Sequence, residues 1–506
     1  MSGSDLYLLS PELCVAAGAL LALVAGMANA NRAVVTAVGL LGLVAALVFT
    51  GLLWAELDGR VDLCSALEGD RGTAVYGALA IDRFALFFKG LIGVSAALVL
   101  LASHAYTQRF AERSAEFTAL VLFAAVGMML LAGGRELITL YVALELSTLP
   151  LVALAAFSGG QRASEAGLKY LVLGAVASAI LLYGMALTFG YTGTTVLEGM
   201  ALSVGDAALD GSRPFGVQVL VLGVVLMVAG FGFKVAAVPF HGWIPDVYEG
   251  APTPITAFLS VASKAAGFAV VMRVFFTAFE PLEVDWALLF AGIAAASMTF
   301  GNLAAIAQAN IKRMLAYSTI AHAGYLLVGL AAVASRTVDG ITIGPETVLF
   351  YLGGYAVTNL AAFFAVIAIA DRTNNESIAS FSGMGRRAPW MAAALTVALL
   401  SLTGIPPTVG FMAKLFVFGA AVKADLAWLV ALGAVNSVVS AYYYLRVVRI
   451  MYLGDPAADE TSDGERPVRA IPLDLSVAVT AVAVVALGLY PQPLFRAAQR
   501  AVEGLF

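Results

Sequence analysis

Hydrophobic residues fill this chain in runs long enough to cross a lipid bilayer, and short polar segments separate the runs. A transmembrane helix needs about 20 predominantly apolar residues, whereas a transmembrane strand needs about ten and alternates apolar with polar positions. Runs of 18 or more apolar residues recur along the whole length. The pattern therefore predicts an all-α polytopic membrane protein and not a transmembrane β-barrel.

About fourteen transmembrane helices are expected. They are predicted at roughly 11–30, 33–53, 82–104, 117–132, 137–157, 164–190, 214–240, 252–279, 286–309, 314–332, 347–370, 389–421, 426–452 and 471–491. Because fourteen is even, both termini should lie on the same side of the membrane.

Charge in the loops indicates the orientation. Lys and Arg are modestly more frequent in the loops opposite the termini, and cytoplasmic loops carry the excess of these residues. We therefore expect both termini outside, with the loops at 105–116, 310–313, 371–388 and 453–470 in the cytoplasm. The last of these loops has the composition of a flexible, solvated segment.

Composition also indicates a membrane protein, and the motifs of most other function classes do not occur. The chain is 61% hydrophobic and 12% charged, with a mean hydropathy of +0.93, whereas a soluble domain has about 25% charged residues. Cys14 and Cys64 are far apart, and no CxxC, dinucleotide-binding, P-loop or haem signature occurs. We expect no cofactor, metal or redox centre in this chain, and no nucleic-acid partner.

The first apolar run ends in Ala28-Asn29-Ala30, which resembles the cleavage site of a signal peptide. Asp5 and Glu12 precede or enter that run without any Lys or Arg, which is the opposite of a signal-peptide start. We interpret the run as a retained first transmembrane helix.

The middle of the chain predicts an internal repeat. Five spans fall in about 114–279 and five more in about 285–452. Because five crossings is an odd number, the second block must be inverted relative to the first, as in many transporters. The chain is therefore divided into three N-terminal helices at 1–110, a first five-helix repeat at 111–280, a second, inverted repeat at 281–453, and a cytoplasmic loop with the last helix at 454–506.

Ionisable side chains interrupt several of these apolar spans. They are Glu145, Lys169, Lys234, Lys264, His322 and Lys414. A charge at the bilayer centre costs about 2.5–3.5 kcal/mol on insertion scales, so each is a candidate for function. Lysine suits proton transfer because its acidity responds strongly to burial and to a nearby carboxylate. A row of such groups, bridged by water and hydroxyls, predicts a proton relay.

Glycine and proline surround two of the lysines, Lys234 in GFGFKVAAVP and Lys414 in GIPPTVGFMAK. Proline removes an amide donor and interrupts a helix. Inside a membrane, unpaired backbone is tolerated only where it is buried in protein or lines a water-filled cavity. We therefore expect a broken helix and bound water beside each of these lysines, one in each repeat.

Competing interpretations stay open for these residues. Lys169 lies near the end of its span and can instead extend to the membrane surface. His322 can instead be a neutral core histidine. For the deeper Glu145, Lys234 and Lys264, and for Lys414 by the same argument, the alternative is a purely structural ion pair. Three further charges at the start of the third span, Asp82, Arg83 and Lys89, are interpreted as an interfacial cluster.

Several segments together resemble the antiporter-like membrane subunits of proton-pumping NADH–quinone oxidoreductase, respiratory complex I. They are YVALELSTLPLVAL, EAGLKYLVLGAVASAILLYG, GFGFKVAAVPFHGWIPDVYEGAPTPITAFLSVASKAAGF, NLAAIAQANIKRMLAYSTIAHAGYLLVGL and LSLTGIPPTVGFMAKLFVF, in this order over about 110–450. Fourteen spans without a long C-terminal lateral helix, and a lysine rather than a glutamate at 414, favour one subunit type within this family.

The resemblance implies a role for each buried residue. Glu145 and Lys234 would form the charge pair of a first half-channel, and Lys264 would link the two halves. Lys414 would load the proton in the second half-channel, with His322 between. Lys169 matches a further lysine of the family.

The resemblance also implies the surroundings of the chain. Flavin and iron–sulfur clusters are expected in partner subunits, and quinone is expected as the substrate of the whole complex, bound elsewhere. The partners would be neighbouring antiporter-like and small membrane subunits in a bacterial inner (plasma) membrane. Three alternatives stay open: a subunit of a multi-subunit cation/proton antiporter, a passive membrane scaffold, and a solute carrier with an anionic substrate between Lys234 and Lys264.

Overall fold

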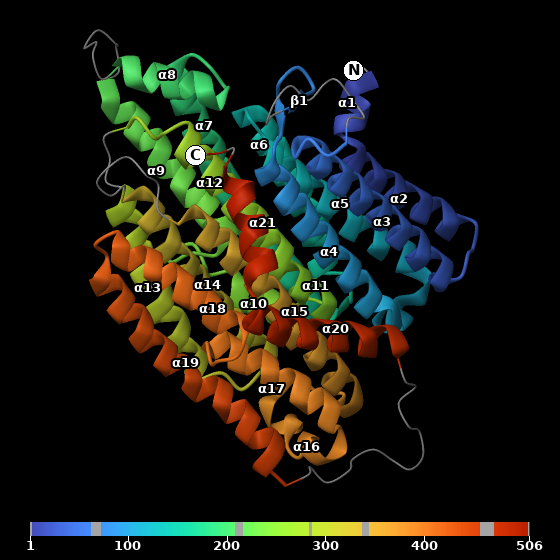
Figure 1. Ribbon diagram of the computed structural model, residues 1–506. Coiled ribbons are helices and arrows are strands. Elements are labelled where there is room, and N and C mark those ends of the chain that lie inside the picture. The colour runs from blue at the N-terminus through green and yellow to red at the C-terminus, as the bar shows by residue number, and fades with distance from the viewer. Residues whose placement is uncertain are drawn as a thin grey trace.

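Figure 1 shows the computed structural model, a bundle of long, tilted helices whose two termini lie at the same end. The structure describes residues 3–61, 72–207, 216–282, 286–335, 344–455, 470–503 and 505. Cys64 and most of the polar loop predicted at 453–470 lie outside these residues. The placement of both termini at one end confirms the even number of crossings.

Helices make up nearly all of the described chain. In order, the elements are α1 (Gly3–Leu8), α2 (Ser10–Met27), α3 (Arg32–Leu57), β1 (Gly72–Ala74), β2 (Leu79–Ile81), α4 (Arg83–Tyr106), the 3₁₀ helix η1 (Thr107–Arg113), α5 (Ser114–Gly133), α6 (Leu137–Ala155), α7 (Gly160–Thr192), α8 (Leu197–Ala207), α9 (Gly216–Val235), α10 (Ile244–Gly250), α11 (Thr253–Phe258), the π-helix η2 (Leu259–Ser263), α12 (Lys264–Thr277), α13 (Trp286–Ile306), α14 (Ile311–Ala334), α15 (Pro345–Thr373), the 3₁₀ helix η3 (Ile378–Phe381), α16 (Met384–Arg387), α17 (Pro389–Thr403), α18 (Val409–Lys423), α19 (Ala427–Leu453), α20 (Ile471–Leu489) and α21 (Gln492–Val502). Strands β1 and β2 pair as a short antiparallel hairpin.

The predicted crossings are confirmed. Among the described residues, 13 helices are long and apolar enough to cross a membrane. The remaining predicted crossing, 389–421, is the pair α17 and α18, which is interrupted at 404–408. The structure adds elements that the hydrophobic pattern did not predict, including α1, the β1–β2 hairpin, α8, α10, α16 and α21.

Two five-crossing blocks contain one interrupted helix each. In the first block, α5 to α12, the break follows α9 and is continued by the short α10. In the second block, α13 to α19, the break separates α17 from α18. The two inverted five-helix repeats, each with a broken helix, therefore form the core of the fold.

Burial separates central from peripheral helices. The segments Thr253–Thr277, Ile311–Ala334 and Pro345–Thr373 are almost wholly enclosed by other helices, whereas most of α7 and α19 is open to the surroundings. Glycine allows α13 and α14 to come into backbone contact, because a Cβ at Gly301 would lie 2.6 Å from the Ala321 amide nitrogen. The enclosed helices carry most of the buried ionisable residues of the second half.

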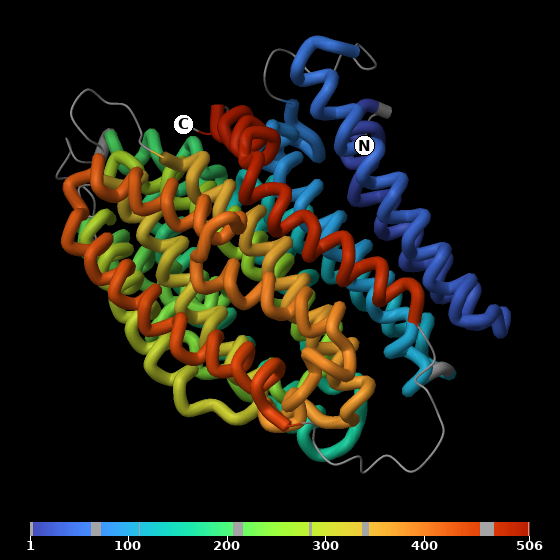
Figure 2. The backbone as a smooth tube through the Cα atoms, turned by 60° about the horizontal axis from the view of Figure 1, so that its bottom comes forward, coloured from blue at the N-terminus to red at the C-terminus, as the bar shows by residue number. Residues whose placement is uncertain are grey.

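The last two helices, α20 and α21, connect the N-terminal helices with the second repeat. Figure 2 shows α20 and α21 running between the N-terminal helices and the second repeat. Leu494 of α21 packs on Gly353, and the Phe495 ring lies 4.9 Å from that of Phe416. Arg500 of α21 reaches Asp58, at the end of α3, with 3.3 Å between nitrogen and oxygen.

The charges at the start of α4 do not form one interfacial cluster, and this prediction is wrong. Asp82 is buried and forms two 2.9 Å hydrogen bonds with the Arg273 guanidinium of α12. Lys89 is buried as well, 2.8 Å from the Glu12 carboxylate of α2. The side chains face the protein because partners on other helices compensate their charges.

Candidate functional site

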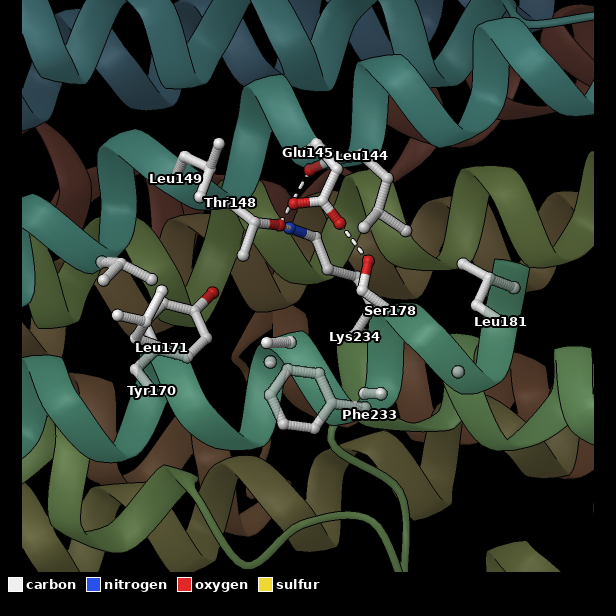
Figure 3. Close-up of a pocket in the computed structure, with 15 residues that line it drawn as sticks. Leu144, Glu145, Thr148, Leu149, Tyr170, Leu171, Ser178, Leu181, Phe233 and Lys234 are labelled. Carbon is white, nitrogen blue, oxygen red and sulfur yellow. Dashed lines mark hydrogen bonds between the residues drawn. The ribbon is translucent and has the colours of Figure 1, made fainter. Parts of the chain in front are cut away.

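The first group of predicted residues meets at a small cavity between α6, α7 and α9. Figure 3 shows the Glu145 and Lys234 side chains entering the same space. The Lys234 ammonium donates to the Ser147 and Thr148 hydroxyls, each at 2.9 Å, and Glu145 accepts a hydrogen bond from Ser178. The cavity has a volume of about 60 Å³, and a water molecule needs only about 10–15 Å³ measured in this way. The site can therefore hold water between the carboxylate and the ammonium.

The helix break after Lys234 has its backbone groups satisfied by side chains. The Trp243 indole donates to the Phe233 carbonyl at 3.1 Å, and the Ser297 hydroxyl of α13 accepts from the Val238 amide at 3.0 Å. Ala236 adopts a left-handed conformation with φ of 70°. The second of these bonds anchors the broken helix of the first repeat to the second repeat.

Lys264 lies where the two repeats meet. It is buried, begins α12 directly after the π-helix η2, and donates to the Thr319 carbonyl of α14 at 2.5 Å. Its ammonium also lies 5.5 Å from the centre of the Tyr355 ring of α15. Gly267, one turn further along α12, allows the Lys234 stem to pack directly on this helix. Lys264 thus has Lys234 on one side and the second repeat on the other.

Hydroxyl and amide groups extend the contacts of Lys264. The Thr319 and Tyr355 hydroxyls are 3.0 Å apart. The Asn359 amide donates to the Tyr355 hydroxyl at 3.1 Å and to the Ser260 hydroxyl at 2.7 Å. Among the described residues, the buried Asn359 Oδ1 has no hydrogen-bond partner. A buried orphan acceptor of this kind is a place for a water molecule.

His322 and Lys414 form the second half of the site. His322 Nδ1 lies 2.8 Å from the Tyr351 hydroxyl, and its ring lies 5.1 Å from that of Tyr355. The Lys414 ammonium lies 4.4 Å from the centre of the Tyr325 ring. Tyr325 is also 5.6 Å from the His322 ring, so aromatic side chains fill the space between the two groups.

The broken helix of the second repeat supplies the partners of Lys414. Its ammonium donates to the Thr403 carbonyl at 2.8 Å and the Leu402 carbonyl at 3.1 Å, at the end of α17, and to the Ser437 hydroxyl at 3.2 Å. The last carbonyls of a helix lack partners within it and attract a cation. Gly404, with φ of 91°, makes the turn and leaves room for the lysine stem.

Lys169 lies apart from this buried group. Its side chain is 40% exposed. Its ammonium nitrogen lies 2.7 Å from a carboxylate oxygen of Glu165, one turn away in α7, and 2.7 Å from one of Asp246 in α10. Arg313 of α14 also contacts Asp246 at 2.7 Å. Burial raises the pKa of the Asp246 carboxyl, but hydrogen bonds from Lys169 and Arg313 outweigh it and hold the pKa below its usual value. The proton-relay role of Lys169 stays a prediction, and its geometry is that of an ion pair at the end opposite the termini.

Sequence reasoning missed several buried polar residues. Arg273 interrupts the apolar run VVMRVFF and was detectable there, whereas Lys312 was hidden in a predicted loop. Asn302, Tyr325 and Tyr443 form a network in which Asn302 contacts both tyrosine hydroxyls. Nothing in the pattern of apolar residues distinguishes these from core positions.

Metal ions in proteins are held by clusters of imidazole, thiolate and carboxylate groups, and the described residues contain all three types. Within them, no three His, Cys, Asp or Glu side chains are placed to hold a metal ion. The expectation that the chain carries no cofactor stays a prediction.

Comparisons with known proteins place this geometry in a family. Residues 134–440 match the family model described as NADH:quinone oxidoreductase/Mrp antiporter, TM. Subunit N of NADH-quinone oxidoreductase from Dehalococcoides mccartyi is 43% identical and covers 99% of both chains. The corresponding protein of Moorella thermoacetica is 42% identical, covering 90% of this chain and 93% of its own.

Solved structures agree with these relatives. A chain of respiratory complex I from Thermus thermophilus with bound aureothin is 32% identical, with a TM-score of 0.76, covering 96% of this chain and 99% of that one. A chain of the Mrp complex from Dietzia sp. DQ12-45-1b has a TM-score of 0.82 over 100% of this chain and 98% of its own, at 22% identity, and shares the fold.

The chain belongs to the NADH:quinone oxidoreductase/Mrp antiporter family of integral membrane proteins. Within that family it groups with subunit N of NADH-quinone oxidoreductase, an antiporter-like membrane subunit of complex I. The relatives and the solved structures fit this grouping better than the alternative of a subunit of a multi-subunit cation/proton antiporter.

Proposed function

We propose that this chain translocates protons through a relay of Glu145, Lys234, Lys264, His322 and Lys414, coupled to quinone reduction elsewhere in the complex. Lys169 is a peripheral member of this group. Flavin and iron–sulfur clusters belong to partner subunits, and quinone is the substrate of the whole complex. The chain sits in the lipid bilayer of a bacterial inner (plasma) membrane beside other membrane subunits, with both termini outside.

One observation carries the proposal: the three buried relay lysines have neutral hydrogen-bond partners. Among the described residues, Lys234, Lys264 and Lys414 bond to hydroxyl or carbonyl oxygens and to no carboxylate within 4.0 Å. Elsewhere in the same molecule, Lys89 pairs with Glu12 and Arg273 with Asp82. A permanently charged group in a dry interior needs an opposite charge.

Neutral acceptors suit a group that changes its charge. A hydroxyl can accept a hydrogen bond from an ammonium and donate one to a neutral amine, so both protonation states keep a partner. A carboxylate would hold the lysine in the charged form. A passive scaffold would gain nothing from three such lysines, whereas a proton relay requires groups that can release and regain a proton.

The test uses the assembled complex in inverted membrane vesicles. Lys234→Ala should abolish NADH-driven proton uptake and lower quinone reduction with it, while the amount of assembled complex on a native gel stays normal. The matched control removes another buried lysine together with its carboxylate, as Lys89→Met with Glu12→Leu, and should pump normally.

Each outcome decides the proposal. Loss of pumping in Lys234→Ala alone supports the relay. Normal pumping in that variant would make the lysine structural, and a sodium-dependent pH gradient in the same vesicles would then indicate cation/proton antiport instead.

A further inference from the structure

A polar cavity of about 290 Å³ lies at the end of the molecule opposite the termini. Its wall comes from five parts of the chain: Arg109 follows α4, Arg162 lies in the first turn of α7, Thr253 begins α11, Asn310 precedes α14, and Asp371 and Glu376 lie at and beyond the end of α15. Arg109 and Asp371 form an ion pair of 2.8 Å across it. The cavity is thus built where the N-terminal helices and both repeats meet, and it is separate from the cavity at Lys234.

The inner side of this cavity is closed by an ion pair whose lysine is buried. Glu376 accepts from the Thr253 hydroxyl at 3.1 Å and from the Lys312 ammonium at 3.0 Å. The Lys312 side chain is 4% exposed and that of Glu376 is 32% exposed. The carboxylate therefore faces the cavity, whereas the ammonium lies behind it in the protein.

Lys312 has a second partner, the Ala251 carbonyl at 2.9 Å. Ala251 ends α10 and lies two residues before α11, the start of the transmembrane segment that carries Lys264. Because this carbonyl lies at a helix end, the ammonium keeps one acceptor if Glu376 becomes neutral. Lys312 can therefore stay in place while its ion pair weakens.

One face of α14 leads from Lys312 to the centre of the molecule. Thr319 and His322 follow Lys312 by seven and ten residues, which places all three on the same side of the helix. Seven residues of helix span roughly 10.5 Å. The Thr319 carbonyl is the acceptor of Lys264, so this face ends at the junction of the two repeats.

We propose that the cavity is a proton inlet and that the Lys312–Glu376 pair is its inner gate. This inference rests on the proposed relay and adds the route by which a proton reaches Lys264. A proton from water in the cavity neutralises the Glu376 carboxylate and weakens the ion pair. Lys312 passes one of its protons to water along α14 and takes the proton from Glu376, which restores both groups and moves one proton inward.

The test compares two substitutions of the carboxylate in the assembled complex, with NADH-driven proton uptake by inverted vesicles as the measurement. Glu376→Gln keeps the hydrogen-bonding shape but cannot take up a proton, and it should lower uptake about tenfold or more. Glu376→Asp keeps the carboxylate and should retain most of the activity. Normal uptake by the Gln variant would overturn the gate.

A matched control removes a carboxylate from the same face but not from the cavity. Glu249 pairs with Arg313 at 2.8 Å, and Glu249→Gln should pump normally. Equal losses in the Glu249 and Glu376 variants would show that loss of any ion pair on this face has the same effect, and would overturn the gate.

A second pair of variants tests the inlet without removing the carboxylate, and decides the question if Glu376→Gln fails to assemble. Ala370 lines the cavity, and Ala370→Trp should fill it and slow proton uptake. Arg372, two residues along and exposed, does not line it, and Arg372→Trp should have little effect. Normal uptake by Ala370→Trp would overturn the inlet.

Different results would contradict the proposed relay and the proposed inlet. If Lys264→Ala stops pumping while the Glu376 and Ala370 variants pump normally, the relay stands and protons enter elsewhere. If Lys264→Ala itself pumps normally, the proposed function fails, whatever the cavity does.

Discussion

Among the described residues, the buried charges outside the Lys312–Glu376 pair are of two kinds, which differ in their partners. Arg273 and Lys89 are held by carboxylates within 2.9 Å. Lys264 and Lys414 are held by hydroxyl and carbonyl oxygens. The first kind fixes helices to one another, because removing one partner leaves an uncompensated charge. A lysine of the second kind can lose its proton without leaving a buried carboxylate uncompensated.

Asp82→Asn tests the first kind. The substitution leaves the Arg273 guanidinium without its opposite charge and should destabilise the folded protein by about 3–5 kcal/mol. Thermal unfolding of the purified complex should show a lower transition temperature and less assembled complex. The double variant Asp82→Leu with Arg273→Met removes both charges and should recover most of the loss. A single variant as stable as the parent would contradict a structural role for the pair.

Tyr355→Phe tests the contacts around the second kind. The ring beneath Lys264 is kept, but the hydroxyl that joins Thr319 to Asn359 is lost. We expect proton uptake in inverted vesicles to fall severalfold with assembly unchanged. Tyr442, whose side chain is exposed, provides the control Tyr442→Phe. Unchanged uptake in both variants would show that the Tyr355 hydroxyl has no part in proton transfer.

At the level of single residues, the charged side chains could be predicted from the sequence, but the polar residues that contact them could not. Glu145, Lys234 and Lys264 were predicted because a charge inside an apolar run is conspicuous. Tyr355 and Asn359 belong to equally apolar surroundings, and only the packing of α15 against α11 and η2 brings them to Lys264. Contacts between helices distant in sequence cannot be derived from the period of one helix.

Among the helices, the interruptions were predictable and the π-helix was not. Glycine and proline mark both breaks, because each residue type disturbs helical hydrogen bonding in a known way. The η2 segment Leu259–Ser263 reads LSVAS and contains neither. Its wider turn sits directly before Lys264, and π-helical turns often occur at functional sites. The position of this π-helical turn is set by the helices packed around it and not by its own residues.

Gly404→Ala tests the geometry of the second break. A Cβ there would lie 3.0 Å from Cδ of Lys414, and φ of 91° disfavours any residue with a side chain. We expect a loss of about 1–2 kcal/mol in stability from the backbone alone, and slower proton uptake because the lysine is displaced. Gly419 lies in α18 with open space around it, so Gly419→Ala is the control. Wild-type unfolding temperature and uptake in Gly404→Ala would refute this account.

For the whole molecule, the number of crossings was predictable and the final helix was not. Hydrophobic runs of sufficient length identify spans directly. Helix α21 reads QPLFRAAQRAV, too short and too polar for this signal, and it is held by contacts with α4 and α15. The division of the chain at 110, 280 and 453 stays a prediction.

Truncation after Pro491 tests the part played by α21. It removes the packing of Leu494 on Gly353 and the ion pair between Arg500 and Asp58, which connect the second repeat with the N-terminal helices. We expect an unfolding transition several degrees lower and a smaller yield of assembled complex. Gln499→Ala, a substitution at an exposed position of the same helix, should change neither quantity. A truncated chain of normal stability would mean that α20 is sufficient for this connection.

The depth of the proposed relay residues in the membrane has an electrical consequence. Glu145, Lys264 and His322 each lie near the midpoint of their membrane-spanning segments, so the line joining them runs in the plane of the membrane. A charge that crosses the membrane does work of about 2.3 kcal/mol per 100 mV, whereas a charge moving in that plane does almost none. In the proposed relay, the membrane voltage would then act on proton entry and exit, and transfer between the repeats would proceed at the same rate at any voltage. Under imposed potassium diffusion potentials, Tyr355→Phe should slow pumping equally at every voltage, whereas Glu376→Gln should slow it most against the largest opposing one.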